Sequence, residues 1–480
     1  MTSLISEGYK RPPWLLRYRS STVFIVATVW TSLFTDFYLY AMIVPVMPTA
    51  LVDRAGVPYQ DREYWVSVLL MCEAAVACIC CPIFGYIVDN TPTRQFPYLL
   101  GLILLGASMV ILSIAHTVGL FIVARLLQGG ATAMVTVAGL ALLTDSVSFD
   151  NLGQVIGYLG SSVALGFLLG PLIGGILYEK SGYQAVFAMA FVIVGVDLLM
   201  RVAVIEKKVA RRWLLEDSET SQSGPHAGGY NTFGDASEPS DSESPKSRKP
   251  ALFLVICQPR IMISSWALLV HGLLYSAFDA TIPVFVETRF HWGPLGAGLT
   301  FLPSAITAFF EPYFGYLSDR YGARKVTLTG FLVLSIPLVC LRFVESNTTS
   351  HIALLITLLT FIGLFMNLCV PALYVETQQV LEDMERERPG IFGKKGAVAQ
   401  AFGVQTMAQF LGLFVGPLWG GFIEYRFGWK NMSWTLALLA GLTAVPMLWL
   451  SNGGDKVRGG EEEERERERE RERLLDGDGA

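Results

Sequence analysis

Ionisable side chains stand inside long apolar runs of this sequence, and four examples are Asp36, Glu73, Arg125 and Asp279. A charge at the centre of an apolar layer costs about 2.5–3.5 kcal/mol on bilayer-insertion scales, so these side chains should face the protein interior or a partner of opposite charge. Removal from water raises the pKa of a carboxyl group towards physiological values, which coupling to a proton gradient requires. The four residues are therefore candidates for proton coupling or for binding a substrate.

Asp36 and Glu73 are the strongest of these candidates, because each lies near the middle of its apolar run. A second interpretation stays open, in which either acid remains protonated or pairs with Arg125 as a structural contact. The other acids in apolar runs are weaker candidates: Asp197, Asp279 and Glu311.

Other kinds of chemistry have no pattern in the sequence. It contains no phosphate-binding glycine loop, no cluster of metal-ligating residues and no nucleophile with its base. The seven cysteines lie mostly in apolar runs, where packing is a better interpretation than a disulfide framework. We expect no enzyme activity, no metal, no organic cofactor and no nucleic-acid partner.

The composition indicates an all-helical membrane protein. Hydrophobic residues make up 52% of the 480 residues, charged residues make up 16%, and the mean hydropathy is +0.47. This balance is too apolar for a water-exposed surface. A helix needs about 20 apolar residues to cross the hydrocarbon layer. Twelve predicted segments reach this length: 22–46, 64–87, 96–115, 118–143, 153–177, 184–205, 261–286, 296–317, 326–344, 351–374, 397–423 and 431–450.

The sequence is duplicated, because two motifs recur in the same order in both halves. Residues 82–89 read PIFGYIVD and residues 312–319 read PYFGYLSD, while 166–175 read GFLLGPLIGG and 412–421 read GLFVGPLWGG. Small residues let helices approach closely, and an internal proline loosens the helix. The second motif predicts two bending, closely packed helices, through these residues: Gly166, Gly170, Pro171, Gly174, Gly175, Gly412, Gly416, Pro417, Gly420 and Gly421.

The duplication predicts two six-helix halves with polar segments around them. The segments are an N-terminal tail (1–21), a first six-helix bundle (22–205), a disordered linker (206–259), a second six-helix bundle (260–450) and a charged C-terminal tail (451–480). The linker is rich in Ser, Gly, Pro and acidic residues, which cannot bury enough apolar surface to order it. In the last segment, Glu470 with Leu474 and Leu475 fits an acidic dileucine sorting signal.

The distribution of basic residues predicts the orientation. Lys and Arg gather in the N-terminal tail, in the linker and in the loops that hold 320–325 and 386–395, all on one side if twelve helices alternate. The positive-inside rule then places both termini in the cytosol. Asn347 begins a glycosylation sequon in a predicted outer loop. We expect a monomer in the plasma membrane, with a vacuolar or vesicular membrane as the alternative.

Two loops carry a resemblance to a known family. The loop after the second segment reads GYIVDNTPTR from 85 to 94, and the loop after the eighth reads GYLSDRYGARK from 315 to 325. Both resemble the G-x-x-x-D-R/K-x-G-x-R/K signature of the major facilitator superfamily, complete in the second half and degraded in the first. The glycine-proline strings and residues 125–130, RLLQGG, resemble further motifs of that superfamily. The loop residues concerned are Gly85, Asp89, Arg94, Gly315, Asp319, Arg320, Gly322 and Arg324.

The resemblance implies two bundles around a central cavity that opens alternately to each side, the major facilitator fold. The loops would then act as a cytosolic latch, with Asp89 and Arg94 paired to charges at neighbouring helix ends. Asp145 and Glu376 are placed to be such partners. By analogy, helices 1, 2, 4, 5, 7, 8, 10 and 11 would line the cavity.

Within the superfamily, residues 33–48 look like the first helix of vesicular amine transporters and related fungal drug:proton antiporters. Asp36 matches the acid of that helix, and Asn367 lies near the place of their helix 10 aspartate. The resemblance implies proton-coupled antiport of a small organic compound, lipophilic or cationic, driven by the proton gradient. A nutrient symporter or uniporter of the same fold and, more remotely, a non-transporting membrane receptor are the alternatives.

Overall fold

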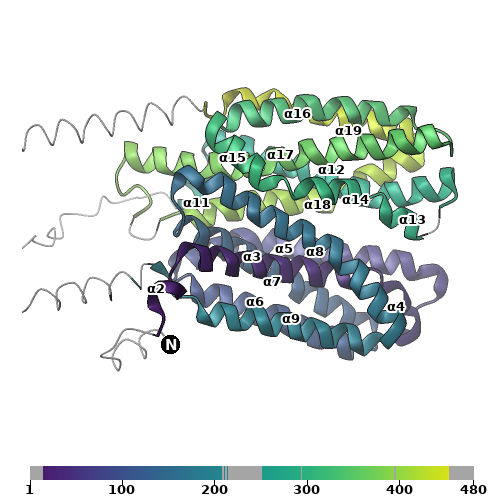
Figure 1. The fold of residues 1–480 in the computed structure, drawn as a ribbon, viewed down its shortest axis with the longest axis horizontal. Helices are drawn as coiled ribbons and strands as arrows, with labels where there is room; N and C mark the ends of the chain where they lie inside the picture. The colour runs from purple at the N-terminus through teal and green to yellow at the C-terminus, as the bar shows by residue number, and fades with distance from the viewer. Residues whose placement is uncertain are drawn as a thin grey trace, which may run out of the picture.

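The computed structural model describes residues 14–207, 210, 213, 251–292, 294–393 and 396–452. They form α-helices and short 3-10 helices, and the described part of the chain contains no strand (Figure 1). The all-helical fold class is therefore confirmed. Most of the predicted N-terminal tail, linker and C-terminal tail, with the dileucine, lies outside the described residues.

The described part of the first half contains six long helices. They are α3 (Thr22–Ile43), α5 (Arg62–Asn90), α6 (Gln95–Ile114), α7 (Val118–Thr144), α8 (Leu152–Ser181) and α9 (Tyr183–Ala203). Four short helices accompany them: α2 (Leu16–Arg19), α4 (Met47–Ala55), η1 (Tyr59–Asp61) and η2 (Phe149–Asn151). Ser21 fixes the start of α3, because its hydroxyl accepts a hydrogen bond from the Phe24 N–H at 3.2 Å and satisfies a donor that the helix leaves free.

Among the described residues of the second half there are five long helices and several short ones. The long ones are α12 (Pro259–Phe290), α16 (Ala323–Cys340), α17 (Thr349–Glu387), α18 (Val398–Phe427) and α19 (Trp429–Ala444). The short ones are α11 (Ala251–Ile256), α13 (Pro294–Leu299), α14 (Leu302–Ala308), α15 (Glu311–Tyr321), η3 (Leu341–Phe343) and η5 (Pro446–Trp449). Thr348 caps α17 as Ser21 caps α3, by accepting from the His351 N–H.

The predicted eighth membrane segment, 296–317, is the one that differs from expectation. It is no single helix but the row α13, α14 and α15, whereas eleven other described helices are long and apolar enough to cross a membrane. Pro294, Pro303 and Pro312 each stand at the first or second position of one helix of the row. Proline has no N–H to donate and fits the start of a helix better than its interior, so each proline begins a new helix. Counted with this row, the described part of the chain has the twelve predicted segments.

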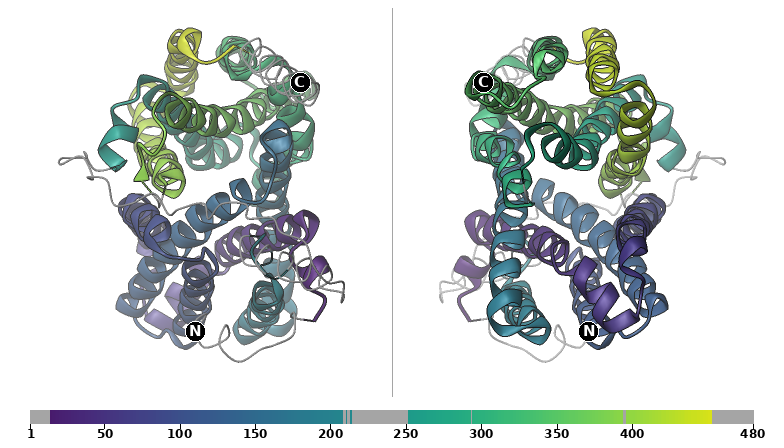
Figure 2. Two further views of the ribbon diagram at one scale, coloured as in Figure 1. Left: turned by 90° about the vertical axis from the view of Figure 1, so that its left-hand side faces the viewer. Right: turned by 90° about the vertical axis from the view of Figure 1, so that its right-hand side faces the viewer.

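The two halves of the chain form two bundles. Figure 2 shows the purple to teal helices of the first half on one side and the green to yellow helices of the second half on the other. The chain enters and leaves the described part at one end of the molecule, where α2 and α11 lie (Figure 1). We call this end the terminus side and the opposite end the far side.

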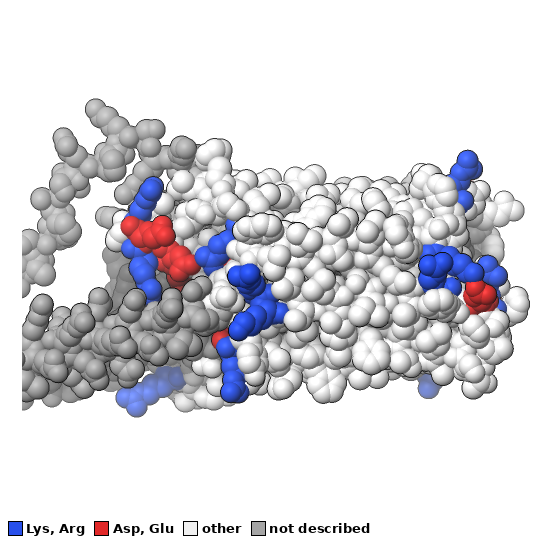
Figure 3. Space-filling view, turned by 90° about the horizontal axis from the view of Figure 1, so that it is seen from above, with Lys and Arg blue, Asp and Glu red and all other residues white. Residues whose placement is uncertain are grey.

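Charged side chains gather at the two ends of the molecule. Figure 3 shows Lys, Arg, Asp and Glu near the terminus side and the far side, while the surface between them on this face is free of charge. Large apolar side chains such as Val192, Leu199 and Phe422 are exposed on the long helices. An apolar belt with charged ends fits a bilayer that surrounds the bundles.

The two glycine-proline strings pack their helices against the first helix of each bundle. A methyl group added at Gly166, Gly170 or Gly174 of α8 would meet α3, and one added at Gly412, Gly416 or Gly420 of α18 would meet α12. Gly175 and Gly421 face open space. Both helices continue through their prolines, Pro171 and Pro417. The motif therefore forms a close-packing face in both halves; bending at the prolines remains a prediction.

Two substitutions in the same string are expected to have opposite effects. In Gly412→Ala, the new Cβ would stand 2.0 Å from the Leu269 carbonyl oxygen, so α12 must move away at a cost of about 1–3 kcal/mol. In Gly421→Ala, nothing lies within 4 Å, and alanine should stabilise the helix by about 0.5–1 kcal/mol. Thermal unfolding of the detergent-solubilised protein should give a lower midpoint for the first and an unchanged or higher one for the second. Equal midpoints would contradict the packing described here.

Candidate functional site

Two cavities lie between the bundles. The acidic chamber, of about 310 Å³, is lined by side chains that include Asp36, Glu73 and Asp279. The apolar chamber, of about 210 Å³, reaches farther towards the terminus side. Together they are lined from α3, α5, α7, α8, α12, α14, α15, α17 and α18, which are the helices 1, 2, 4, 5, 7, 8, 10 and 11 that the resemblance implied.

A group of mostly aromatic side chains separates the two chambers. The side chains that line both are Phe37, Phe167, Tyr275, Asp279, Phe410 and Leu413. The ring of Phe167 is central, with its centroid 5.4 Å from that of Phe37, 5.8 Å from that of Tyr40 and 5.9 Å from that of Tyr275. Since these rings come from α3, α8 and α12, the partition joins both bundles.

Asp36 is buried at the wall of the acidic chamber, with 1% of its surface exposed. Its Oδ1 accepts a hydrogen bond from the Thr132 hydroxyl at 2.9 Å, while Oδ2 has no hydrogen-bond partner among the described residues. A buried carboxylate without a counter-ion is unfavourable, so this environment favours the neutral acid. Binding of a cation or access of water would reverse that preference.

Glu73 is paired with Arg125. Arg125 Nη1 donates to Glu73 Oε2 at 2.8 Å and to Gln128 Oε1 at 3.0 Å, and the side chains of the ion pair are at most 5% exposed. The guanidinium also lies 5.7 Å from the centre of the Tyr40 ring. Glu73 and Arg125 thus form the ion pair that the second interpretation named, and the role of this pair stays a prediction. Glu73 still lines the acidic chamber, so the pair forms one charged edge of it.

The other two candidates lie on the second bundle. Asp279 of α12 lines both chambers, with its side chain exposed to them. Asn367 lines only the apolar chamber, and its Nδ2 donates to the Thr307 hydroxyl at 3.2 Å. The structure thus brings Asp36, Glu73 and Asp279 to the acidic chamber, with Arg125 behind Glu73. Asn367 lies in the apolar chamber, which Asp279 also lines but Asp36 and Glu73 do not.

Three polar side chains of the apolar chamber were missed or ranked low from the sequence. His271 is buried with neither ring nitrogen hydrogen-bonded among the described residues, and Gln409 accepts from the Tyr374 hydroxyl at 3.0 Å. Glu311, a weaker candidate from the sequence, also lines this chamber. A histidine in an apolar run was a visible signal, but nothing in the sequence showed which way it faces.

The first signature loop holds the opposite bundle. The Asp89 carboxylate accepts from the backbone N–H groups of Ala399 at 3.1 Å and Gln400 at 2.9 Å, at the start of α18, and from Arg94 Nη1 at 3.0 Å. Arg94 Nε also pairs with Asp145 at 3.3 Å, as the resemblance implied. A helix N-terminus favours a negative charge, so Asp89 binds α18 through its free N–H groups.

The second signature loop repeats this arrangement from the other bundle. Asp319 accepts from the backbone N–H groups of Gly153 and Gln154, both at 3.0 Å, at the start of α8. Gly85 and Gly315 allow these approaches, because a Cβ at either would lie within 2.6 Å of backbone oxygen across the interface. Gly322 has a φ of +85° that glycine adopts readily. Both loops therefore join the two bundles at the terminus side.

The remaining loop residues lie close to these contacts. Arg320 Nη1 lies 3.4 Å from the Tyr316 hydroxyl, and the Arg324 N–H donates to the Ser451 carbonyl at 3.1 Å.

Asn347, the sequon residue, is exposed on the far side, and its Nδ2 donates to the Phe290 carbonyl at 2.7 Å. Its glycosylation stays a prediction.

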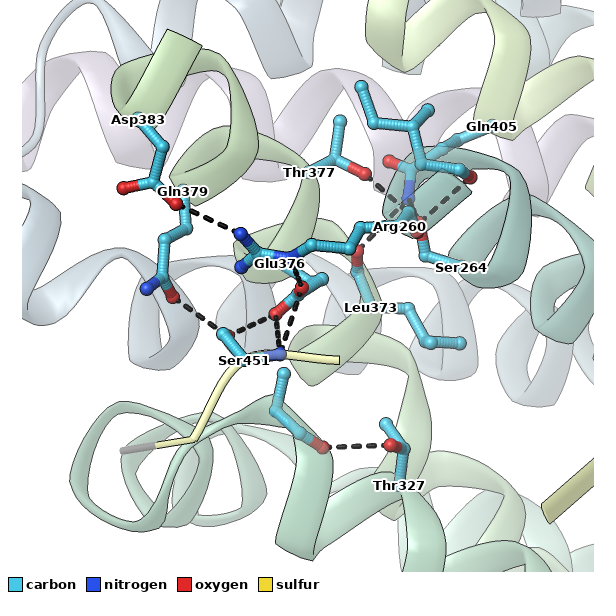
Figure 4. Close-up of polar contacts among 12 residues, drawn as sticks. Arg260, Ser264, Thr327, Leu373, Glu376, Thr377, Gln379, Asp383, Gln405 and Ser451 are labelled. Atoms are coloured by element: carbon cyan, nitrogen blue, oxygen red, sulfur yellow. Dashed lines mark hydrogen bonds and ion pairs between the residues drawn. The ribbon is translucent and has the colours of Figure 1, made fainter. Parts of the chain in front are cut away.

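Glu376 does not pair with either signature loop, in contrast to expectation. It binds Arg260 Nε at 2.7 Å and accepts hydrogen bonds from the backbone and side chain of Ser451 (Figure 4). Arg260 also pairs with Asp383 at 2.9 Å. Glu376 pairs with Arg260 of α12 because α17 and α12 are neighbours within the second bundle. This network ties α12, α17 and the end of the described chain together.

Comparison with known proteins agrees with this architecture. The sequence matches the family model described as the Major Facilitator Superfamily over residues 29–386 and over 265–476. The chain belongs to this superfamily. It is 31% identical over 467 residues to the MFS-type transporter ppzB of Metarhizium rileyi, which covers 90% of this chain and 95% of that protein.

Two further relatives bear on the fold and the transporter class. The class B tetracycline resistance protein of Escherichia coli is 28% identical over 316 residues, 64% of this chain and 69% of that protein. The crystal structure of the human organic anion transporter MFSD10 (TETRAN) superposes with a TM-score of 0.64 at 16% identity, over 91% of this chain and 100% of that one, and shows the shared fold. The predicted superfamily is confirmed, and its members are secondary transporters of small molecules, not enzymes.

Proposed function

We propose that this superfamily member is a proton-coupled antiporter that exports a small organic compound, lipophilic or cationic, by alternating access. The observation that carries the proposal is that Asp36 and Asp279, from opposite bundles, line one chamber, and that Asp36 Oδ2 has no hydrogen-bond partner among the described residues. A protonated Asp36 is stable while the chamber is dry, and a cation or water would take the place of the proton. Proton and substrate would then compete for the same carboxyl.

The chamber walls support a substrate with a large apolar part. Phe37, Phe167, Tyr275 and Phe410 line both chambers, and the polar groups around them are few. Apolar sites with a few placed polar groups bind small organic molecules. The name of the tetracycline resistance protein, a relative over two thirds of its length, agrees with export of such a compound.

The orientation and membrane are part of the same proposal. The positive-inside rule supports a cytosolic terminus side, which makes the closed loops of this structure a cytosolic gate. We expect a monomer in the plasma membrane, or in a vacuolar or vesicular membrane. A symporter or uniporter would have the same fold, and a non-transporting receptor would move no compound at all.

Purified protein in proteoliposomes with an imposed pH gradient distinguishes these possibilities. With a fluorescent lipophilic cation as the probe, we expect transport against the proton flow for the native protein. Asp36→Asn should lose the effect of the gradient while the protein remains folded, because the amide cannot release a proton. The matched control is Asp53→Asn, since Asp53 is an exposed acid on α4.

The outcomes separate the alternatives. Transport by the native protein that ignores the gradient would support a uniporter, movement with the protons would support a symporter, and no transport of any compound in a broad panel would support a receptor. If the Asp36→Asn variant still transported the probe in response to the pH gradient, the role given to Asp36 would be contradicted.

A further inference from the structure

Glu311 is an acid of the second bundle that lies in the interface with the first. It is the first residue of α15, follows the break after α14 and lines the apolar chamber with only 6% of its surface exposed. The terminus end of the same helix carries Asp319, which holds the start of α8. Glu311 and Asp319 therefore lie along one contact between the bundles.

Two glycines of α8 make room for Glu311. A Cβ built at Gly160 would stand 1.4 Å from the Glu311 Oε2, and one built at Gly157 would stand 2.2 Å from the Glu311 carbonyl oxygen. Any other residue at Gly160 would occupy the place of the carboxyl group. The carboxyl group thus lies in a niche of the first bundle, and separation of α15 from α8 has to empty that niche.

The niche offers no positive charge. No hydrogen bond or ion pair to the Glu311 carboxyl occurs among the described residues, and none of the described residues that line the apolar chamber is Lys or Arg. The ionisable groups that face the chamber are His271, Tyr275 and Asp279 of α12 and Tyr374 of α17, while α8 contributes none. On α15 itself, Asp319 and Arg320 lie two turns or more towards the terminus side.

These surroundings favour the neutral acid while the interface is closed. A buried carboxylate without a counter-ion or donors pays a large desolvation penalty. The N-terminus of α15 offers some stabilisation to a negative charge, but the C-terminal end of α14 directly precedes it and carries the opposite partial charge. Water that enters between α8 and α15 would remove the penalty, and the ionised form would become the stable one.

We propose that Glu311 is a second proton-carrying residue, whose protonated form holds α15 against α8 and whose ionised form is stable only when this interface is open to the terminus side. In the opening step, the carboxyl O–H bond breaks, the proton passes to water on the terminus side and the carboxylate remains hydrated. Closure requires that a proton return. The inference rests on the proposed proton coupling. It adds Glu311 as a residue whose neighbours differ between the closed and the open interface. Asp36, in contrast, is hydrogen-bonded to Thr132 of its own bundle.

The test measures the opening itself. Spin labels would be attached to cysteines at Phe96 of α6 and Tyr321 of α15, which are exposed at the terminus ends of opposite bundles, in a background without the seven native cysteines. The distance between the labels would be followed from acidic to alkaline pH. We expect the native protein to shift from a short to a long distance as the pH rises, and Glu311→Gln to keep the short distance throughout.

Two further variants make the result decisive. Asp36→Asn should keep the pH-dependent opening although it loses gradient-driven transport, so failure of the transport proposal and failure of this inference are read from different experiments. Gly160→Ala fills the niche from the other bundle and should favour the long distance at every pH, which tests the same contact if Glu311→Gln does not fold. A native protein without pH-dependent opening, or a Glu311→Gln or Gly160→Ala variant that responds to pH like the native protein, would overturn the inference.

Discussion

Replacing Glu73 by Met is expected to lower the free energy of unfolding by about 3–5 kcal/mol, because the guanidinium of Arg125 stays charged in a site where it is 1% exposed. Replacing Arg125 by Met should cost less, since the carboxyl of Glu73 can take up a proton and become neutral. The double variant should lie near the native protein, because an apolar pair of similar volume replaces a buried ion pair with little loss. Thermal unfolding in detergent measures all three.

The order of the variants is the informative result. Lowering the pH should restore part of the stability of Arg125→Met and none of that of Glu73→Met, because only a carboxyl can be neutralised in this range. The contradicting result would have two parts. The two single variants would be equally stable, and the loss of unfolding free energy in the double variant would equal the sum of their losses, which would show that the two side chains are not coupled.

Replacing Asp89 by Ala is expected to shift the protein towards a state open at the terminus side. The carboxylate accepts from two backbone N–H groups of α18, from the Gln400 side-chain amide and from Arg94. A hydrogen bond to a charged group contributes about 1.5–3 kcal/mol. Loss of one such contribution changes the ratio of open to closed protein by about 10- to 100-fold. The distance between spin labels on the two bundles reports this ratio.

The symmetric variant is a control for this prediction. Asp319→Ala removes the same kind of contact with α8 and should shift the distance in the same direction, whereas Asp53→Ala removes an exposed acid from α4 and should leave it unchanged. A short distance in both Asp89→Ala and Asp319→Ala would mean that the loops do not hold the bundles together.

The fold could be predicted from the sequence wherever a pattern was local, such as an apolar run, or repeated in both halves. Repeated strings at 82–89 and 312–319 predicted paired bundles, and both aspartates of these strings hold the opposite bundle. The interrupted eighth segment was missed because hydropathy does not register Pro303 and Pro312, although their spacing was visible. Apolar composition sets membrane insertion, and proline sets where a helix begins, so the two signals have to be read together.

The site was predictable in part. The cost of a charge in lipid indicated Asp36 and Glu73 without any structure, and the pairing of Glu73 with Arg125 was one of the two interpretations kept. The niche of Glu311 could not be predicted, because it depends on Gly157 and Gly160, about 150 residues earlier in the chain, and only packing brings the two segments together. For the same reason, the direction in which His271 faces was not evident.

Alternating motion of the two bundles is the central claim, and a reversible crosslink tests it most directly. Cysteines at Asn90 and Val398, in a cysteine-free background, flank the hydrogen bond between Asp89 and Ala399 and would be joined by a short crosslinker with a reducible bond. The account predicts that crosslinking stops gradient-driven transport in proteoliposomes and that reduction restores it. Transport that continues at the native rate with the two bundles joined would contradict the account.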